Sequence, residues 1–147
     1  MRHLRKLLIG GLSAAFALAA FAAGSGEKGN AAEPGMFACP APYHHDGDAI
    51  RCGGKGRSSR LYAIDAPEMP GACRPGRQCT PGDPFASRDH LRALTKGRKV
   101  QCRQVDMDRY QRPVVQCFAG GVDLSCAMVR DGFAVERYGR LSGCLLR

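Results

Sequence analysis

A chain of 147 residues is long enough for one domain with a modest core and too short for several. Its 22 Lys and Arg outnumber its 13 Asp and Glu, and the formal net charge of +9 suggests an anionic partner such as nucleic acid or an acidic surface. An aromatic content of 7%, with no Trp, argues against a surface dedicated to stacking bases.

The first 22 residues have the layout of an export signal. A basic segment, MRHLRK, precedes an apolar run of mostly small residues, and Ala20-Phe21-Ala22 supplies an A-x-A cleavage site. The alternative is an uncleaved membrane anchor, but the run is short for a membrane span and rich in Ala and Gly. We therefore predict a signal peptide over residues 1–22, cleaved near Ala22. The mature protein is then secreted or periplasmic and free of the membrane, and we expect a monomer.

A Gly/Ala-rich lead-in without periodicity follows at residues 23–37, and the remaining residues, 38–147, read as one domain. The domain begins with short strands joined by tight turns at Asp46-Gly47 and at GGKG. These strands form a predicted three-stranded meander over 37–44, 49–52 and 58–64.

A loop rich in Pro, Gly and Cys comes next, at residues 69–83, and Asp83-Pro84 then starts a helix with a capping carboxylate and a Pro in the first turn. This helix should end near Lys96, because Gly97 suits the position after a helix end. The last predicted elements are strands at 100–105 and 114–118 around DMDRYQRP, and a helix at 124–131 capped by Asp123.

Three strands, a helix, two strands and a helix is the element order of a five-stranded Greek-key barrel of the OB type. We therefore predict a β-barrel with helices, an α+β domain stabilised by disulfides. The alternative at this point is a small α+β sheet domain of another topology.

Eight cysteines, an even number behind an export signal, indicate a disulfide framework. Zinc is the competing interpretation, but no C-x-x-C pair exists, and neither His44 nor His45 has a ligand spacing to a pair of cysteines.

The predicted strand register favours one disulfide above the others. Cys102 and Cys117 fall opposite each other if the hairpin turns at Arg109-Tyr110, and opposed Cβ atoms lie close to disulfide range. The other predicted pairs are Cys73–Cys79 within one loop, Cys39–Cys52 across the first hairpin, and Cys126–Cys144 by elimination. Cys39–Cys52 fits least well, since a turn near Gly47 places Cys52 opposite Pro42.

Carboxylates and arginines gather where the meander strands end. Asp48 starts the second strand and Asp65 ends the third, so two hard-oxygen ligands suited to Ca²⁺ should meet at one end of the barrel. Glu68 can reach the same end without binding the metal, and Arg60 and Arg112 add positive charge. This combination suits attack of water on a phosphodiester. Each element alone is weak, because DG is a common turn and the other charges could belong to solvated loops.

Together, HDGDAIR, RLYAIDAPE, DRYQR and DLSCAMVRDGFA resemble the staphylococcal nuclease-like (thermonuclease) family over about residues 38–138. The resemblance implies an OB-fold, Ca²⁺-dependent nuclease that cuts DNA and RNA and leaves 3′-phosphate ends. It implies Ca²⁺ ligands at Asp48, Asp65 and the Ala66 carbonyl, and Glu68 as general base. It also implies that Arg60 and Arg112 hold the scissile phosphate, and that substrate is bound by Arg109, Tyr110 and Tyr138.

Three positions depart from the family pattern. Ala49 stands where Thr usually follows DGD, and the family's long C-terminal helix has no counterpart after Tyr138. Gln111 stands where Gly is usual in DRYGR, so either Gln111 tolerates a positive φ or the turn relaxes and re-aims Arg112. We favour relaxation, which predicts that Gln111→Gly raises kcat.

Two other functions stay open. One is a catalytically weak nucleic-acid-binding module of the same fold, and the other is a disulfide-stabilised interaction protein that shares only the architecture. Both are disfavoured by the complete set of catalytic side chains.

Overall fold

The computed structural model describes residues 35–54 and 56–144, so the predicted signal peptide and most of the lead-in lie outside the described residues. In this part of the chain the strands are β1 (Met36–Ala38), β2 (Ala49–Ile50), β3 (Ser59–Leu61), β4 (Ile64–Asp65), β5 (Val100–Met107), β6 (Pro113–Ala119), β7 (Val122–Asp123) and β8 (Val135–Glu136), and the helices are α1 (Pro84–Thr95) and α2 (Leu124–Arg130).

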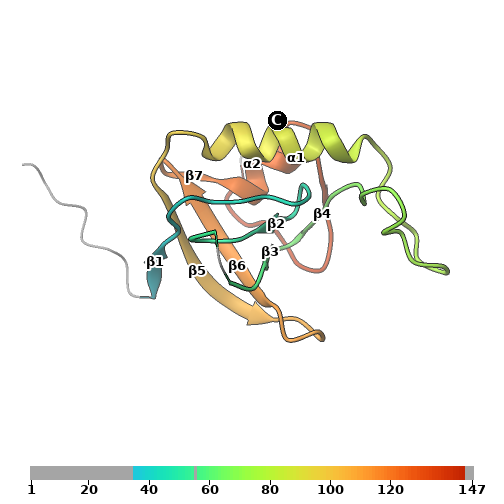
Figure 1. Ribbon diagram of the computed structural model, residues 1–147, viewed down its shortest axis with the longest axis horizontal. Coiled ribbons are helices and arrows are strands. Elements are labelled where there is room, and N and C mark those ends of the chain that lie inside the picture. The colour runs from blue at the N-terminus through green and yellow to red at the C-terminus, as the bar shows by residue number, and fades with distance from the viewer. Residues whose placement is uncertain (1–34, 55, 145–147) are drawn as a thin grey trace, which may run out of the picture. The chain divides into compact units, whose positions relative to one another are not determined.

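Most of the strands belong to one mixed sheet with the order β1-β5-β6-β3-β2, to which β7 adds beside β6 (Figure 1). The β3–β6 pair is parallel, and the other pairs in this sheet are antiparallel. The predicted closed barrel of five strands is not confirmed, because β1 and β2 remain the edges of the sheet. The segments that follow β1 and β2 are joined by the isolated bridge between Tyr43 and Arg51 rather than by a continuous ladder. The hydrogen bond from the Gly53 amide to the Pro40 carbonyl at 2.6 Å and the Cys39–Cys52 disulfide connect the same segments.

The predicted third strand is divided in two. Ala63 has a φ of 61°, a left-handed conformation that no regular strand contains, so β3 stops at Leu61 and β4 begins at Ile64. β4 leaves the main sheet and pairs with β8, two residues that the sequence did not predict as a strand. The turn at Ala63 thus redirects the chain just before Asp65.

Both helices are confirmed to within one residue at each end. The Asp83 side chain accepts hydrogen bonds from the first amides of α1, and Asp123 accepts one from α2. Leu91 of α1 and Met128 of α2 are fully buried, and the two helices pack against each other, with α2 also against β6. Gly97, at a φ of 69°, follows the end of α1 as expected.

All four predicted disulfides are present: Cys39–Cys52, Cys73–Cys79, Cys102–Cys117 and Cys126–Cys144. Cys102 and Cys117 are direct partners in the β5–β6 ladder, with a Cα–Cα distance of 4.1 Å. The misfit expected for Cys39–Cys52 is removed by Ala41, whose φ of 42° kinks the chain after β1 and brings Cys39 across from Cys52.

The turn that carries Asp48 packs tightly on α1. A Cβ atom added at Gly47 would lie 1.8 Å from the Oγ of Ser87 and 2.9 Å from the Cβ of Ala66. Ser87 is fixed in turn by donating to the Phe133 carbonyl at 2.7 Å. Only Gly fits between α1 and the segment after β4, so this glycine holds the turn close to the end of β4.

Candidate active site

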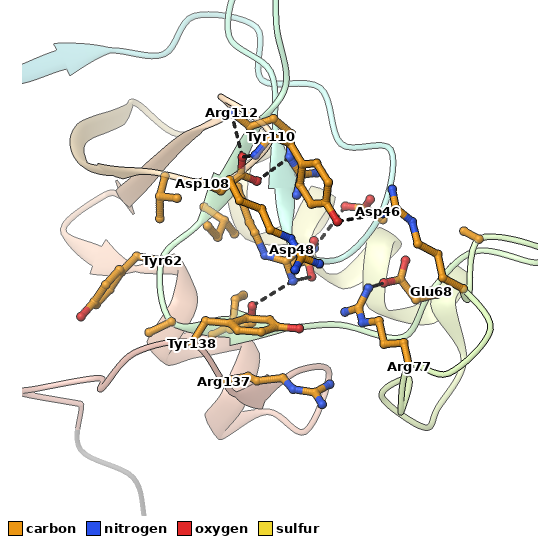
Figure 2. A pocket seen from close by; sticks show the side chains of 18 of the residues that line it. Asp46, Asp48, Tyr62, Glu68, Arg77, Asp108, Tyr110, Arg112, Arg137 and Tyr138 are labelled. Atoms are coloured by element: carbon orange, nitrogen blue, oxygen red, sulfur yellow. Dashed lines mark hydrogen bonds and ion pairs between the residues drawn. The ribbon is translucent and has the colours of Figure 1, made fainter.

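An open pocket of about 1000 Å³ lies between the ends of β3 and β4, the loop after β4, the β5–β6 hairpin and the segment after β8 (Figure 2). Seven of the nine predicted site residues line it: Asp48, Arg60, Glu68, Arg109, Tyr110, Arg112 and Tyr138. The other two, Asp65 and Ala66, are buried at the end of β4. The pocket therefore brings together the residues that the sequence singled out.

Arg60 connects the two aspartates. Its Nη2 donates to Oδ2 of Asp48 at 2.9 Å and to Oδ1 of Asp65 at 2.6 Å. Asp48 precedes β2, whose Ala49 is the antiparallel partner of Arg60 in β3. A positively charged nitrogen thus sits between two carboxylates that come from segments far apart in the sequence.

Asp65 is surrounded by donors. Its Oδ1 also accepts from Nη2 of Arg77 at 2.6 Å, and its Oδ2 accepts from Oγ1 of Thr80 at 2.7 Å and Nη1 of Arg137 at 2.9 Å. Burial alone would raise the pKa of Asp65, but the hydrogen bonds from Thr80 and Arg137 and the charges of Arg77 and Arg60 lower it below its ordinary value. Asp65 is therefore held as a carboxylate.

The pKa of Asp48 is set by a different balance of burial and charge. Burial raises the pKa of Asp48 to about 7, although the charge of Arg60 pulls it down. Its Oδ2 also accepts from the backbone amide of Ala66 at 3.0 Å, so the end of β4 is tied directly to this carboxylate.

Glu68 joins the same network through a residue that the sequence did not predict. Its carboxylate accepts from Nη1 of Arg77, which also contacts Asp65 through Nη2. One guanidinium therefore bridges the carboxylate proposed to bind metal and the carboxylate proposed as base.

Arg112 reaches the pocket from the β5–β6 hairpin and contacts neither Asp48 nor Asp65. Its Nε donates to Oδ2 of Asp108 at 2.7 Å, and its backbone amide donates to Oδ1 of the same residue at 2.9 Å. Gln111 has a φ of 59°, so it tolerates the strained conformation, and the predicted relaxation of the turn is not observed.

Two tyrosines lie on either side of Asp48 in Figure 2. Tyr110 carries the guanidinium of its neighbour Arg109 over its ring, 4.8 Å from the centroid. Tyr138 is two-thirds exposed, at 66%, and lies beneath Arg60, whose Cζ is 5.2 Å from its centroid. Its φ of 64° is costly for a bulky side chain, and strain of this kind is found most often at functional sites.

The oxygen ligands at the end of β4 fit a hard cation. Asp48 and Asp65 already converge on one positive charge, the Arg60 nitrogen, which stands where a cation would be attracted. The only cluster of at least three potential ligands found among residues 35–54 and 56–144 consists of Cys39, Cys52 and Cys102. All three are in disulfides, so they offer no thiolate to zinc.

Three contributors were missed: Arg77, Thr80 and Arg137. Arg77 and Thr80 lie in the Cys-rich loop, where sequence periodicity gives no information, and Arg137 follows a strand of two residues. The sequence offered one signal, and only for Arg137: it precedes Tyr138, which the family pattern had already marked as a substrate-binding residue.

The family model described as staphylococcal nuclease homologue matches residues 58–143, more than half of the chain. No match was found among curated proteins. The matched region includes eight of the nine predicted site residues and begins after Asp48.

Proposed function

Because this chain belongs to the family of staphylococcal nuclease homologues, we propose that it is a Ca²⁺-dependent nuclease that hydrolyses phosphodiester bonds in DNA or RNA and leaves 3′-phosphate ends. The observation that carries the proposal is the contact of one Arg60 nitrogen with both Asp48 and Asp65, with Glu68 in the same network. A buried pair of carboxylates that shares one cation suits a divalent metal beside a phosphate.

In this proposal Asp48, Asp65 and the Ala66 carbonyl hold Ca²⁺, which when bound neutralises charge on a phosphoryl oxygen. Glu68 orients the attacking water and accepts its proton. Arg60 would release its carboxylates and donate to the phosphate instead.

The second phosphate-binding arginine is Arg112, and its support is geometric. Asp108 holds both its amide and its Nε, and Arg112 lines the pocket, so we infer that Nη1 and Nη2 donate to the phosphate. Arg109, Tyr110 and Tyr138 are proposed to bind the rest of the strand, since they line the same pocket.

The four disulfides are consistent with an oxidising compartment outside the cytosol. Neither described helix is long and apolar enough to cross a membrane. We propose that residues 1–22 direct export and that residues 38–147 form the nuclease domain. The bridge between Tyr43 and Arg51 supports an OB-type arrangement in which the sheet edges approach each other.

The test is digestion of single-stranded DNA and RNA by the oxidised protein, with Ca²⁺ or with EGTA. We expect cleavage only with Ca²⁺, and products whose 5′-hydroxyl ends accept label from a polynucleotide kinase without phosphatase treatment. Glu68→Gln protein, purified in the same way, controls for a contaminating nuclease. Full cleavage in EGTA would contradict the metal-dependent mechanism.

A catalytically weak nucleic-acid-binding module is the second candidate, and one observation favours it. Both oxygens of Asp65 are already occupied by protein donors, including three arginines, and a metal must compete with them. Binding of DNA without cleavage at saturating Ca²⁺ would identify this alternative.

A further inference from the structure

Residues 73–79 form a small ring closed by the Cys73–Cys79 disulfide. Within it, the amide of Arg77 donates to the carbonyl of Arg74 at 3.1 Å, and Pro75 and Gly76 occupy the two central positions of the turn. Gly76 has a φ of 77°, so this is a type II turn with the residues that such a turn prefers. Proline, glycine and the disulfide together fix the turn that carries both arginines.

The two arginines of this turn reach different walls of the pocket. Arg77 contacts Asp65 and Glu68, while Nη1 of Arg74 donates to the Tyr110 hydroxyl at 2.8 Å. The guanidinium of Arg74 also lies over the Tyr110 ring, 5.1 Å from its centroid. The side chains of the ring thus connect the carboxylate network to the β5–β6 hairpin.

With Asp48 ionised, as metal binding requires, the ion-pair network carries no net charge. Its three carboxylates are matched by three guanidiniums, and the members are Asp48, Asp65, Glu68, Arg60, Arg77 and Arg137. A divalent cation bound by these carboxylates adds positive charge that no further carboxylate of the network balances. The phosphates of a nucleic acid strand supply the missing negative charge, and guanidiniums released from carboxylates are the natural donors to them.

Arg77 has a further reason to change partners. Its Nε is buried and has no hydrogen-bond partner in the described part of the chain. A buried donor left unpaired costs about 1–3 kcal/mol. Arg77 is therefore stabilised by a ligand that accepts from more of its guanidinium N–H groups, Nε included. A phosphate has enough oxygens to do so.

We propose that the Cys73–Cys79 ring is a further substrate-binding element, in which Arg77 binds the phosphate next to the scissile one and Arg74 positions Tyr110. The inference rests on the proposed nuclease function and adds a residue to its binding site. Arg77 exchanges Asp65 and Glu68 for the phosphate when the site is loaded.

The probe is deoxyadenosine 3′,5′-bisphosphate, which has two neighbouring phosphates and no phosphodiester bond to cut. Its affinity is measured by calorimetry in Ca²⁺ at several NaCl concentrations, beside that of the 5′-monophosphate. Arg77→Gln should weaken the bisphosphate by about tenfold or more, because a hydrogen bond to a charged group contributes about 1.5–3 kcal/mol. The affinity of Arg77→Gln should also depend less on the NaCl concentration, because one charge–charge contact that salt screens has been removed.

The matched control is Arg130→Gln, which removes a guanidinium paired with Asp131 outside the pocket and should leave binding unchanged. In Arg77→Gln the affinity for the monophosphate should fall much less than the affinity for the bisphosphate, because the monophosphate lacks the second phosphate. Arg77→Lys should recover part of the affinity, since it restores charge without the fork.

Opening the ring with Cys73→Ser and Cys79→Ser should weaken the bisphosphate although Arg77 remains, because the turn no longer presents it. Equal binding by wild type, Arg77→Gln and Arg130→Gln would overturn the inference and leave the nuclease proposal standing. Failure of the wild-type protein to bind either nucleotide in Ca²⁺ would overturn both.

Discussion

Arg60 donates to Asp65 at 2.6 Å although the two residues are five positions apart, a spacing that puts side chains on opposite faces of a regular strand. The turn at Ala63, with its φ of 61°, lies between them and changes the direction of the chain. Two residues that alternation would separate therefore meet in one ion pair.

This ion pair predicts an effect on stability that can be measured separately from catalysis. Arg60→Gln leaves Asp48 and Asp65 buried with less compensation, and breaking a buried pair typically costs about 3–5 kcal/mol. We expect a fall of this order in the free energy of unfolding in EGTA, with Ca²⁺ raising the melting temperature more in the variant than in wild type. Denaturant and thermal unfolding measure both effects. Arg130→Gln is the control, and unchanged unfolding of Arg60→Gln in EGTA would contradict the bridging role.

Glu68→Gln separates chemistry from binding. The amide keeps an oxygen that can accept from Arg77 but cannot take a proton from water, so nucleotide and Ca²⁺ affinity should stay near wild type. The cleavage rate should fall by several orders of magnitude, because proton transfer and water orientation act mainly in the transition state. Single-turnover cleavage and calorimetry measure the two quantities. A near wild-type rate would show that another group is the base.

The disulfides should differ in their contribution to stability. Cys102 and Cys117 are fully buried in the core, whereas Cys73–Cys79 closes a much shorter and more exposed loop. Replacing Cys102 and Cys117 by Ala should lower the free energy of unfolding by about 2–5 kcal/mol. Opening the 73–79 ring should cost less, since less chain entropy is restored to the unfolded state. Denaturant unfolding of the oxidised variants gives the comparison, and equal losses would be incompatible with it.

The sequence was sufficient wherever local chemistry decides structure. The caps Asp83 and Asp123 set the helix starts, and the Cys102–Cys117 register followed from alternation alone. What could not be predicted depends on contacts between distant segments. Ala63 has no local signal for a positive φ, and β8 depends on its pairing with the distant strand β4.

The residues of the candidate site also divide into those that the sequence predicted and those that depend on contacts between distant segments. Asp48, Asp65 and Glu68 were found from their places at strand ends and from family motifs. Arg77 was missed because its role arises from where the Cys73–Cys79 ring folds back, which composition and spacing do not encode.

His44 predicts a pH dependence of stability. It is buried, with Nδ1 3.0 Å from the Ala49 carbonyl oxygen and Nε2 3.0 Å from Oγ1 of Thr95. Burial lowers the pKa of His44 from 6.5, partly opposed by the Ala49 hydrogen bond, while the charge of Arg92 lowers it further. The unfolded chain then binds the proton more readily, so the contribution of neutral His44 is fully present above pH 6.5 and is lost as the pH falls below that value.

Asp48 has the opposite effect on the pH dependence of stability. Because its pKa is raised in the folded protein, folding takes up a proton between about pH 4 and 7. The His44 effect is therefore read from the difference between wild type and His44→Gln, measured by denaturant unfolding from pH 5 to 8. This difference should shrink as the pH falls below 6.5. His45→Gln, at the exposed neighbouring position, is the matched control. A His44 difference independent of pH would mean that its burial does not control its protonation.

Gln111→Gly tests the strained turn before Arg112. Gln111 keeps a φ of 59°, and the left-handed conformation costs an ordinary residue about 1–2 kcal/mol, while Gly adds about 0.5–1 kcal/mol of chain entropy to the unfolded state. We therefore expect Gln111→Gly to raise the free energy of unfolding by up to about 1 kcal/mol. This expected increase in stability takes the place of the increase in kcat that a relaxed turn would have predicted.

The rate should stay the same because Asp108, not residue 111, fixes Arg112. Asp108 accepts from both the amide and the Nε of Arg112, and its own amide donates to the Arg112 carbonyl at 2.9 Å. Removing strain at Gln111 leaves these three contacts in place. Asp108→Asn weakens the contact to Nε and should lower kcat, which makes it the positive control. If Gln111→Gly increased kcat without increasing stability, the strained turn would be misaligning Arg112 after all.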